Sequence, residues 1–508
     1  MRTVIFGVDG LTLRILRPLI ERGDLPNFAR LQREGVTADF ISTACPFTAP
    51  AWMSIATGLR PAKHGVFDFW DFDTASAQPT AKSVSHRKGG KAIWNILSEF
   101  GKRVVVLNVP LTYPPEPVNG IMVSGLMTPA PSSAYTFPFS FKDELYNVVP
   151  DYRIDLLGDQ VSERHLYDQV MQMTEKRIQL QEHLLSEHEW DFAFLCYVGP
   201  DRLQHRLWNS IITLDHEATR YYRLLDDALG RVLGHLTAED MLFVVSDHGF
   251  VGLSSRFYIY EYLRRQNLLQ LTSLKKREWA VLIGMGRDIA QRLHLLDATN
   301  EVRNRYNELH NRRTLLEKSL ALNNVVWGES QACVLSWSAF AGGYADIVMS
   351  PHATNNDMER LRAALSNQRD PETGEPLVRT IHTTDDLGDG PFRPQQEHLM
   401  VIPSPGITFH LLTGRKKLWE KEHISEGCHE PEGVFFAYGA GIRRGVQANA
   451  LQVYDLVPTI LHALNIAAKE PLDGQIAHEI FAENTARYVE VGDTMVARKL
   501  KHLHGSKE

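Results

Sequence analysis

Short apolar runs, often rich in β-branched residues, alternate along the chain with longer stretches of helical periodicity. The helical pattern is clearest at 91–101, from Ser162 to Glu187 and at 453–466, where Pro458 lies inside the pattern. Continuous apolar runs are typical of strands in a buried parallel sheet. We therefore predict an α/β layered fold with a mostly parallel central sheet and helices on both faces. The predicted strands are 3–9, 103–110, 120–126, 191–199, 241–247 and 433–439.

The pattern changes after residue 252. A charged stretch of helical character covers 275–282 and 300–320, and a segment rich in Pro and Asp follows at 383–397. We interpret 253–406 as a largely helical insertion or cap over a catalytic core. The core is then formed by residues 1–252 and 407–490, and residues 491–508 form a charged C-terminal tail.

Composition narrows the class of protein. The 508 residues are 44% hydrophobic and 23% charged, as in an ordinary globular protein, and the net charge of -7 offers no basic field for specific nucleic-acid binding. The four cysteines, Cys45, Cys196, Cys333 and Cys428, have no CxxC spacing and fit a reduced compartment. The sequence begins in a predicted strand, and no apolar run reaches the roughly 20 residues of a membrane helix. We expect a cytoplasmic protein without a membrane span.

Acidic and histidine side chains follow several of the predicted strands. Asp9 ends the first strand, Asp201 comes after 191–199, and Asp247 with His248 ends 241–247. Ligands of open parallel sheets bind at the carboxyl ends of the strands. Each of these residues alone suits a turn or a helix cap, but together they predict a shared site.

The same residues have the chemistry of metal ligands. Asp201 and His205 are four residues apart at a probable helix start, so both fall on one helix face. Asp247 and His248 can share an ion if the chain turns at Gly249. His429, in a polar loop before 433–439, completes the set. Imidazole with carboxylate suits zinc, cobalt, manganese or iron better than calcium.

Thr48 lies two residues before Pro50, ahead of a helix-like run. One interpretation is a helix cap, because threonine accepts from free amides and proline tolerates the first turn. The alternative is that the N–H groups of a helix beginning near Pro50 bind an anion, at which the Thr48 oxygen points.

The order of these motifs resembles a known family. Asp9, "FTAPAW" with "TGLRPAKHG", "DRLQH", "SDHG" and a late histidine in "EGCHEPEG" are similar to the alkaline phosphatase superfamily, in particular its type I phosphodiesterase and nucleotide pyrophosphatase branch. "DRLQHRLW", "DPETGEP" and "EPEGVFFAYG" resemble a bacterial group of predicted phosphohydrolases or phosphomutases. The resemblance runs from Asp9 to about Gly474.

The resemblance implies an alkaline phosphatase-like fold and two divalent ions, most simply zinc, with manganese or iron as alternatives. Asp201, His205 and His429 would hold one ion. The other would be held by Asp9, Asp247 and His248 and would also bind the Thr48 oxygen. Thr48 would then attack phosphorus and form a phosphothreonine that water hydrolyses. The implied partner is a phosphorylated small molecule, and His64 is expected to have a structural role.

Two departures bear on the substrate. The pyrophosphatase branch has Asn where this chain has Ala51. Arg202 and Gln204 lie between two predicted ligands and are candidates for a substrate contact, the alternative being that they pack the helix or face solvent. The sulfatase signature needs Cys or Ser at position 48 and Arg at position 52, where this chain has Thr48 and Trp52. We therefore expect a phosphodiesterase or pyrophosphatase type of hydrolase. The alternatives are a phosphomutase or phosphotransferase using the same site, and a non-catalytic scaffold of the same fold.

Overall fold

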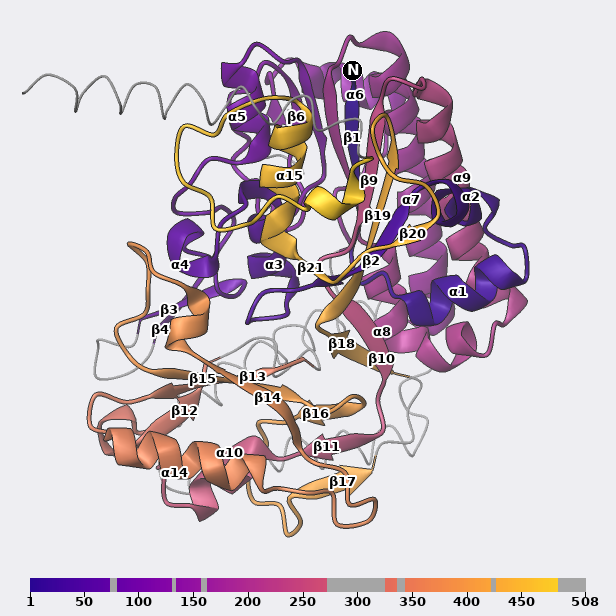
Figure 1. Ribbon diagram of the computed structural model, residues 1–508. Coiled ribbons are helices and arrows are strands. Elements are labelled where there is room, and N and C mark those ends of the chain that lie inside the picture. The colour runs from indigo at the N-terminus through magenta and orange to yellow at the C-terminus, as the bar shows by residue number, and fades with distance from the viewer. Residues whose placement is uncertain are drawn as a thin grey trace, which may run out of the picture.

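The computed structural model describes residues 1–73, 80–129, 134–156, 162–271, 325–335, 343–421 and 426–482. Its largest element is a ten-stranded sheet in the order β20-β2-β19-β9-β1-β8-β5-β6-β7, with β21 also paired to β2 (Figure 1). Its strands are β1 (Thr3–Val8), β2 (Val36–Ile41), β5 (Val104–Leu107), β6 (Gly120–Val123), β7 (Thr136–Phe137), β8 (Phe192–Tyr197), β9 (Met241–Val245), β19 (Glu432–Gly439), β20 (Val446–Gln447) and β21 (Leu451–Gln452).

The centre of this sheet is parallel. β1 pairs in parallel with β8 and β9, and β5 pairs in parallel with β8 and β6. β19 runs antiparallel to both β9 and β2, and β7 runs antiparallel to β6. The prediction of a mixed α/β fold with a mostly parallel sheet is confirmed.

Helices cover both faces of the sheet (Figure 1). Alternate residues of β1 enter two hydrophobic clusters, since Phe6 packs on one face and Ile5 on the other. The Phe6 face is covered by α1 (Leu13–Glu21), α2 (Pro26–Glu34), α6 (Phe141–Val148), α7 (Glu163–Glu187), α8 (Gly199–Ile212) and α9 (His216–His235). The Ile5 face is covered by α3 (Thr48–Thr57), α5 (Ile93–Glu99) and α15 (Leu456–Ala463), and the short α4 (Pro61–His64) follows α3.

A second region lies below the central sheet in Figure 1. Its own hydrophobic cluster includes Phe257, Trp327, Ile347 and Val401. The sheet β12-β13-β15-β14 and the sheet β16-β11-β17 belong to it. Its elements are β11 (Ser255–Phe257), α10 (Ile259–Arg265), β12 (Ala332–Val334), β13 (Ala345–Met349), α14 (Asn355–Ser366), β14 (Val378–Thr383), β15 (His398–Pro403), β16 (Ile407–Phe409) and β17 (Trp419–Lys421).

Two small ribbons complete the described strands. β3 (Trp70–Asp73) pairs with β4 (Thr80–Ser83), and β10 (Gly249–Gly252) pairs with β18 (Gly427–Glu430). Single 3-10 turns are η1 (Trp327–Glu329), η2 (Thr384–Leu387), η3 (Val453–Asp455) and η4 (His478–Ile480). The β10-β18 ribbon joins residues almost 180 positions apart and positions part of the candidate site.

The structure bears on the helices predicted after residue 252. The described part of 253–406 contains the helices α10 and α14 together with the strands β11, β12, β13, β14 and β15, and the charged stretches predicted as helical, 275–282 and 300–320, lie outside the described residues, as does 491–508. The helix predicted at 453–466 is shorter, because η3 precedes α15, and Pro458 lies in the first turn of α15, where its missing N–H costs nothing. Within the described residues, no helix combines the length and apolar character needed to cross a membrane.

Candidate active site

The carboxyl ends of β1 and β9 meet the start of α8 at one edge of the sheet. The Asp9 amide donates to the Tyr197 carbonyl at 2.8 Å, so parallel pairing continues to the end of β1. The chain then turns at Gly10, whose φ of +69° suits glycine and whose amide donates to Asp247 Oδ1 at 3.1 Å. The Asp201 amide donates to the Asp9 carbonyl at 3.2 Å. These backbone contacts bring together side chains from three distant parts of the sequence.

The first group of side chains contains Asp9, Asp247 and His248. His248 Nε2 lies 3.5 Å from Asp9 Oδ1 and 3.3 Å from Asp247 Oδ2. All three residues are buried. We call this group the Asp9 trio.

The second group contains Asp201, His205 and His429. His429 Nε2 lies 3.1 Å from Asp201 Oδ1 and 3.0 Å from His205 Nε2, and Asp201 Oδ1 lies 3.3 Å from His205 Nε2. Asp201 and His205 are on α8, one turn apart, as their spacing predicted. We call this group the His429 trio. The structure thus brings together all six residues predicted as metal ligands.

The position of His429 corrects one expectation. His429 was predicted in a loop, but it lies in β18 opposite Phe250 of β10. The polar sequence around His429 lacks a strand pattern, and the pairing comes from a partner far away in the chain. Strand pairing fixes the His429 side chain more firmly than a loop would.

Thr48 is the first residue of α3, so this helix begins two residues earlier than predicted. The helix cap is Phe47, which is extended, and no side chain caps the helix. The Thr48 hydroxyl instead lies 3.4 Å from His248 Nε2. The structure therefore favours a hydroxyl directed at the Asp9 trio over a helix cap.

The backbone sets which ring nitrogens face the site. His248 Nδ1 lies 3.1 Å from the Gly249 carbonyl, and His205 Nδ1 lies 3.3 Å from the Gly427 carbonyl. A carbonyl only accepts, so each Nδ1 donates its proton to the backbone and each Nε2 points toward the carboxylates. This is how backbone groups orient histidine ligands in metal sites.

Burial governs the protonation of the site. It lowers the pKa of His248 to about 4 and, together with the neighbouring His248 ring, that of His429 to about 3. Burial, with the charges of Asp247 and Asp201, raises the pKa of Asp9 well above its usual range, and burial likewise raises that of Asp247. For Asp201 burial acts in the same direction, but His205 and His429 outweigh it and hold its pKa well below the usual range. Burial thus favours neutral imidazoles at His248 and His429, beside the crowded carboxylates of Asp9 and Asp247.

The arrangement fits divalent metal ions. Asp9 Oδ1 and Asp247 Oδ2 are buried without a hydrogen-bond partner among the described residues. The ligand atoms of Asp9, Asp247 and His248 lie within 4.8 Å of one another, as do those of Asp201, His248 and His429. A tetrahedral zinc site with bonds of about 2.0 Å separates its ligand atoms by roughly 3.3 Å. The spacings within both trios are close to this value.

The remaining predicted residues have different surroundings. Arg202 is turned toward Asp155: Arg202 Nη2 lies 2.6 Å from Asp155 Oδ2. Arg202 Nη1 lies farther from Asp201, at 3.9 Å from its Oδ2. Ala51 is fully buried in α3, and its amide donates to the Phe47 carbonyl at 3.1 Å. His64 has a partner at each ring nitrogen: Val66 N donates to its Nδ1, and its Nε2 lies 3.0 Å from Ser54 Oγ. His64 therefore has no free nitrogen for a ligand.

Trp52 and Gln204 support the site in ways that were not predicted. Trp52 Nε1 donates to Asp9 Oδ2 at 3.0 Å, and Gln204 Nε2 donates to the Gly10 carbonyl at 2.7 Å. Trp52 is one helical turn after Thr48, so the spacing alone places both on one face of α3. Gln204 lies between Asp201 and His205, but no feature of the sequence assigned it to the turn after β1.

Comparison with known proteins agrees with this geometry. A family model described as type I phosphodiesterase / nucleotide pyrophosphatase matches residues 3–430. No curated protein sequence matches the chain. Among solved structures, human ectonucleotide pyrophosphatase / phosphodiesterase 5 is similar, with 14% identity, a TM-score of 0.51 and coverage of 95% of this chain and 100% of that one. The murine protein gives the same identity and coverage with a TM-score of 0.50.

A bacterial enzyme shows the same fold. Phosphonoacetate hydrolase from Sinorhizobium meliloti 1021, solved with phosphonoformate, is 15% identical with a TM-score of 0.54, covering 92% of this chain and 95% of that one. At identities this low, the structural likeness establishes a shared fold and no more. The family match, in contrast, is a match of sequence and extends over most of the chain. The chain belongs to the type I phosphodiesterase / nucleotide pyrophosphatase family of phosphoester hydrolases, as its motifs indicated.

Proposed function

We propose that the protein is a two-metal phosphodiesterase that works through a covalent phosphothreonine on Thr48. The observation that carries this proposal is the position of the Thr48 hydroxyl, 3.4 Å from the His248 nitrogen that also faces Asp9 and Asp247. The Asp9 trio would hold one divalent ion and the His429 trio the other. Zinc suits this mixture of carboxylates and imidazoles best.

Bound ions would promote deprotonation of hydroxyl groups and offset the negative charge of the phosphoryl group. The chain itself holds the reacting groups in place. Thr48 lies at the N-terminus of α3, where the helix dipole is positive and the amides of Thr48 and Ala49 precede the first intrahelical bond. Trp52 Nε1 donates to Asp9, and the Gly10 amide donates to Asp247, so both carboxylates are held in place.

Attack of the Thr48 oxygen on phosphorus forms the Thr48–phosphorus bond and breaks the bond to the leaving alcohol, which takes up a proton. Water then attacks the same phosphorus, releases Thr48 and restores its proton. Two displacements at one phosphorus replace a single difficult step by two easier ones. Transfer to an acceptor alcohol instead of water would make the protein a phosphotransferase.

We infer that phosphodiesters are preferred to monoesters. A monoester brings an additional charged oxygen, which needs its own donor. The arginines around the site already have carboxylate partners: Arg202 is paired with Asp155 at 2.6 Å and Arg14 with Glu430 at 2.9 Å, while Arg379 also pairs with Glu432. A diester can be held by the two ions and the α3 amides without an arginine. The substrate class proposed is a phosphorylated small molecule.

The test of this proposal is the metal content of the purified protein together with its turnover of a nitrophenyl phosphodiester. We expect the candidate active site to hold close to two transition-metal ions per chain, and we expect chelation to abolish turnover and zinc to restore it. Active protein without metal would overturn the proposal. Assays with and without an added alcohol separate hydrolysis from phosphotransfer, because only phosphotransfer yields a new ester.

A further inference from the structure

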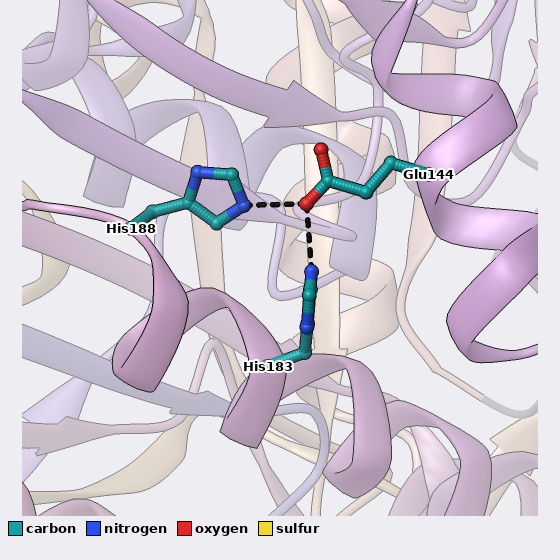
Figure 2. Close-up of side chains that lie close together, drawn as sticks. All are labelled: Glu144, His183 and His188. Atoms are coloured by element: carbon teal, nitrogen blue, oxygen red, sulfur yellow. Dashed lines mark hydrogen bonds and ion pairs between the residues drawn. The ribbon is translucent and has the colours of Figure 1, made fainter.

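A second cluster of potential metal ligands lies away from the candidate active site. Figure 2 shows Glu144 of α6 facing His183, near the end of α7, and His188, the C-cap residue of that helix. Both imidazoles point at one oxygen: His183 Nε2 lies 2.6 Å and His188 Nε2 lies 2.7 Å from Glu144 Oε1. The three ligand atoms lie within 4.8 Å of one another.

This cluster is at the opposite end of the sheet from Thr48. A cavity of about 510 Å³ borders it and is lined by Glu144 and His188 together with Val104 and Gly120, which begin β5 and β6. The candidate active site instead follows the carboxyl ends of β1 and β9. Figure 1 likewise places α6 at the top of the sheet, far from α3 and β18. The two sites share no residue.

The three side chains have the negative charge and the access to solvent that binding of a cation requires. Burial acts to raise the pKa of Glu144, but hydrogen bonds from His183 and His188 outweigh it and lower that pKa below its ordinary value. The carboxylate is therefore charged at neutral pH. The side chains are 21% exposed for His183, 28% for His188 and 41% for Glu144, so an ion can reach them from solvent.

We propose that Glu144, His183 and His188 form a third metal site that takes Zn²⁺ or a cation of similar softness. Two imidazoles and a carboxylate are a zinc ligand set, and the adjoining cavity can supply water for the fourth position. The present spacings are those of hydrogen bonds, about 0.6 Å shorter than the roughly 3.3 Å between ligands of a tetrahedral ion. The half-exposed Glu144 side chain can move by this amount. A bound ion would fasten α6 to the connection between α7 and β8.

The structure offers a matched control. His462 and His478 also form a T-shaped pair, with ring centroids 5.2 Å apart and planes at 79°, compared with 5.5 Å and 79° for His183 and His188. No carboxylate is bonded to the His462 pair in the described residues. If histidine proximity alone binds zinc, both pairs will do so, whereas the proposal requires the pair that has Glu144.

The experiment compares the wild-type protein, as purified, with His188→Gln, Glu144→Gln and His478→Gln after equilibrium dialysis against Zn²⁺. We expect wild type and His478→Gln to hold one ion more per chain than the other two variants. Added Zn²⁺ should raise the melting temperature of wild type further than that of His188→Gln, while all four turn over a nitrophenyl phosphodiester within about twofold of one another. Equal zinc content in wild type, His188→Gln and Glu144→Gln would overturn the proposal. Because the result is a difference between variants, it does not depend on how many ions the candidate active site holds.

Discussion

His248 and His429 stack their imidazole rings, with centroids 3.7 Å apart and planes inclined at 20°. His248 precedes β10 and His429 lies in the strand paired with it, so the ribbon sets this contact. One ring belongs to the Asp9 trio and the other to the His429 trio. The two trios are therefore neighbours in one site, as the proposed in-line displacement with two ions requires.

Replacing Thr48 by alanine is expected to leave the fold and the metal content unchanged and to lower kcat by on the order of 10³-fold or more. The reason is that the substitution removes the attacking oxygen but no metal ligand from either trio. Thr48→Ser should recover part of the activity, since it keeps the hydroxyl. Steady-state kinetics on a nitrophenyl phosphodiester measures both effects.

Thr57→Ala is the control for Thr48, because Thr57 is a buried threonine of the same helix whose hydroxyl donates to the Met53 carbonyl. It should retain nearly wild-type kcat. Wild-type turnover in Thr48→Ala would mean that the hydroxyl takes no part in the chemistry.

His429→Gln is expected to lose one of two active-site ions and to keep the other. Its matched control is His64→Gln, since both histidines are buried and burial lowers the pKa of each to about 3. They differ in that His429 Nδ1 has no hydrogen-bond partner among the described residues and its Nε2 faces Asp201 and His205, whereas both nitrogens of His64 have partners. Metal analysis of the two purified variants measures the difference. Equal metal content in both would show that His429 is not a ligand.

A nitrophenyl phosphodiester is expected to have a higher kcat/KM than nitrophenyl phosphate at the same pH. Loss of one donor to a phosphoryl oxygen costs about 3 kcal/mol, roughly a hundredfold in rate. Asp155→Asn should narrow the gap, because it removes the charge that holds Arg202 away from substrate. A monoester advantage of tenfold or more in the wild-type protein would refute the expected preference.

Acid should destabilise the protein partly through His64. Burial, together with the Arg87 charge, lowers the pKa of His64 in the folded state to about 3 from 6.5. The unfolded chain therefore takes up a proton that the folded chain does not as the pH falls from 6.5 toward 3, and stability is lost over this window. Between pH 6.5 and 4.5, His64→Gln should lose about 2 kcal/mol less unfolding free energy than wild type. Urea unfolding at the two pH values measures this, and equal losses would contradict it.

Much of the fold was predictable because its local signals agree with its tertiary structure. The apolar run at 3–9 forms β1, Thr3–Val8, and Ser162 caps α7 by accepting from the His165 amide. The active-site residues were predictable because they follow strands or share one helix face. Their proposed ligand roles came from carboxylate and imidazole chemistry and from the resemblance of the motif order to a known family.

Other features depend on contacts between distant segments. The pairing of β18 with β10 leaves no pattern in the polar sequence around His429. The cluster of Glu144 with His183 and His188 also has no signature, because it forms only when α6 packs beside the end of α7. The pairing of Arg202 with Asp155 joins residues 47 positions apart and could not be read from the helix spacing.

The most direct test of the central claim, attack by Thr48, is the stereochemistry of hydrolysis at phosphorus. A chiral phosphorothioate diester hydrolysed in ¹⁸O-labelled water reports it by phosphorus NMR, whether or not the intermediate accumulates. Each in-line displacement inverts the configuration, so the route through Thr48 predicts net retention. Net inversion would mean that water attacks the substrate directly and would contradict the account.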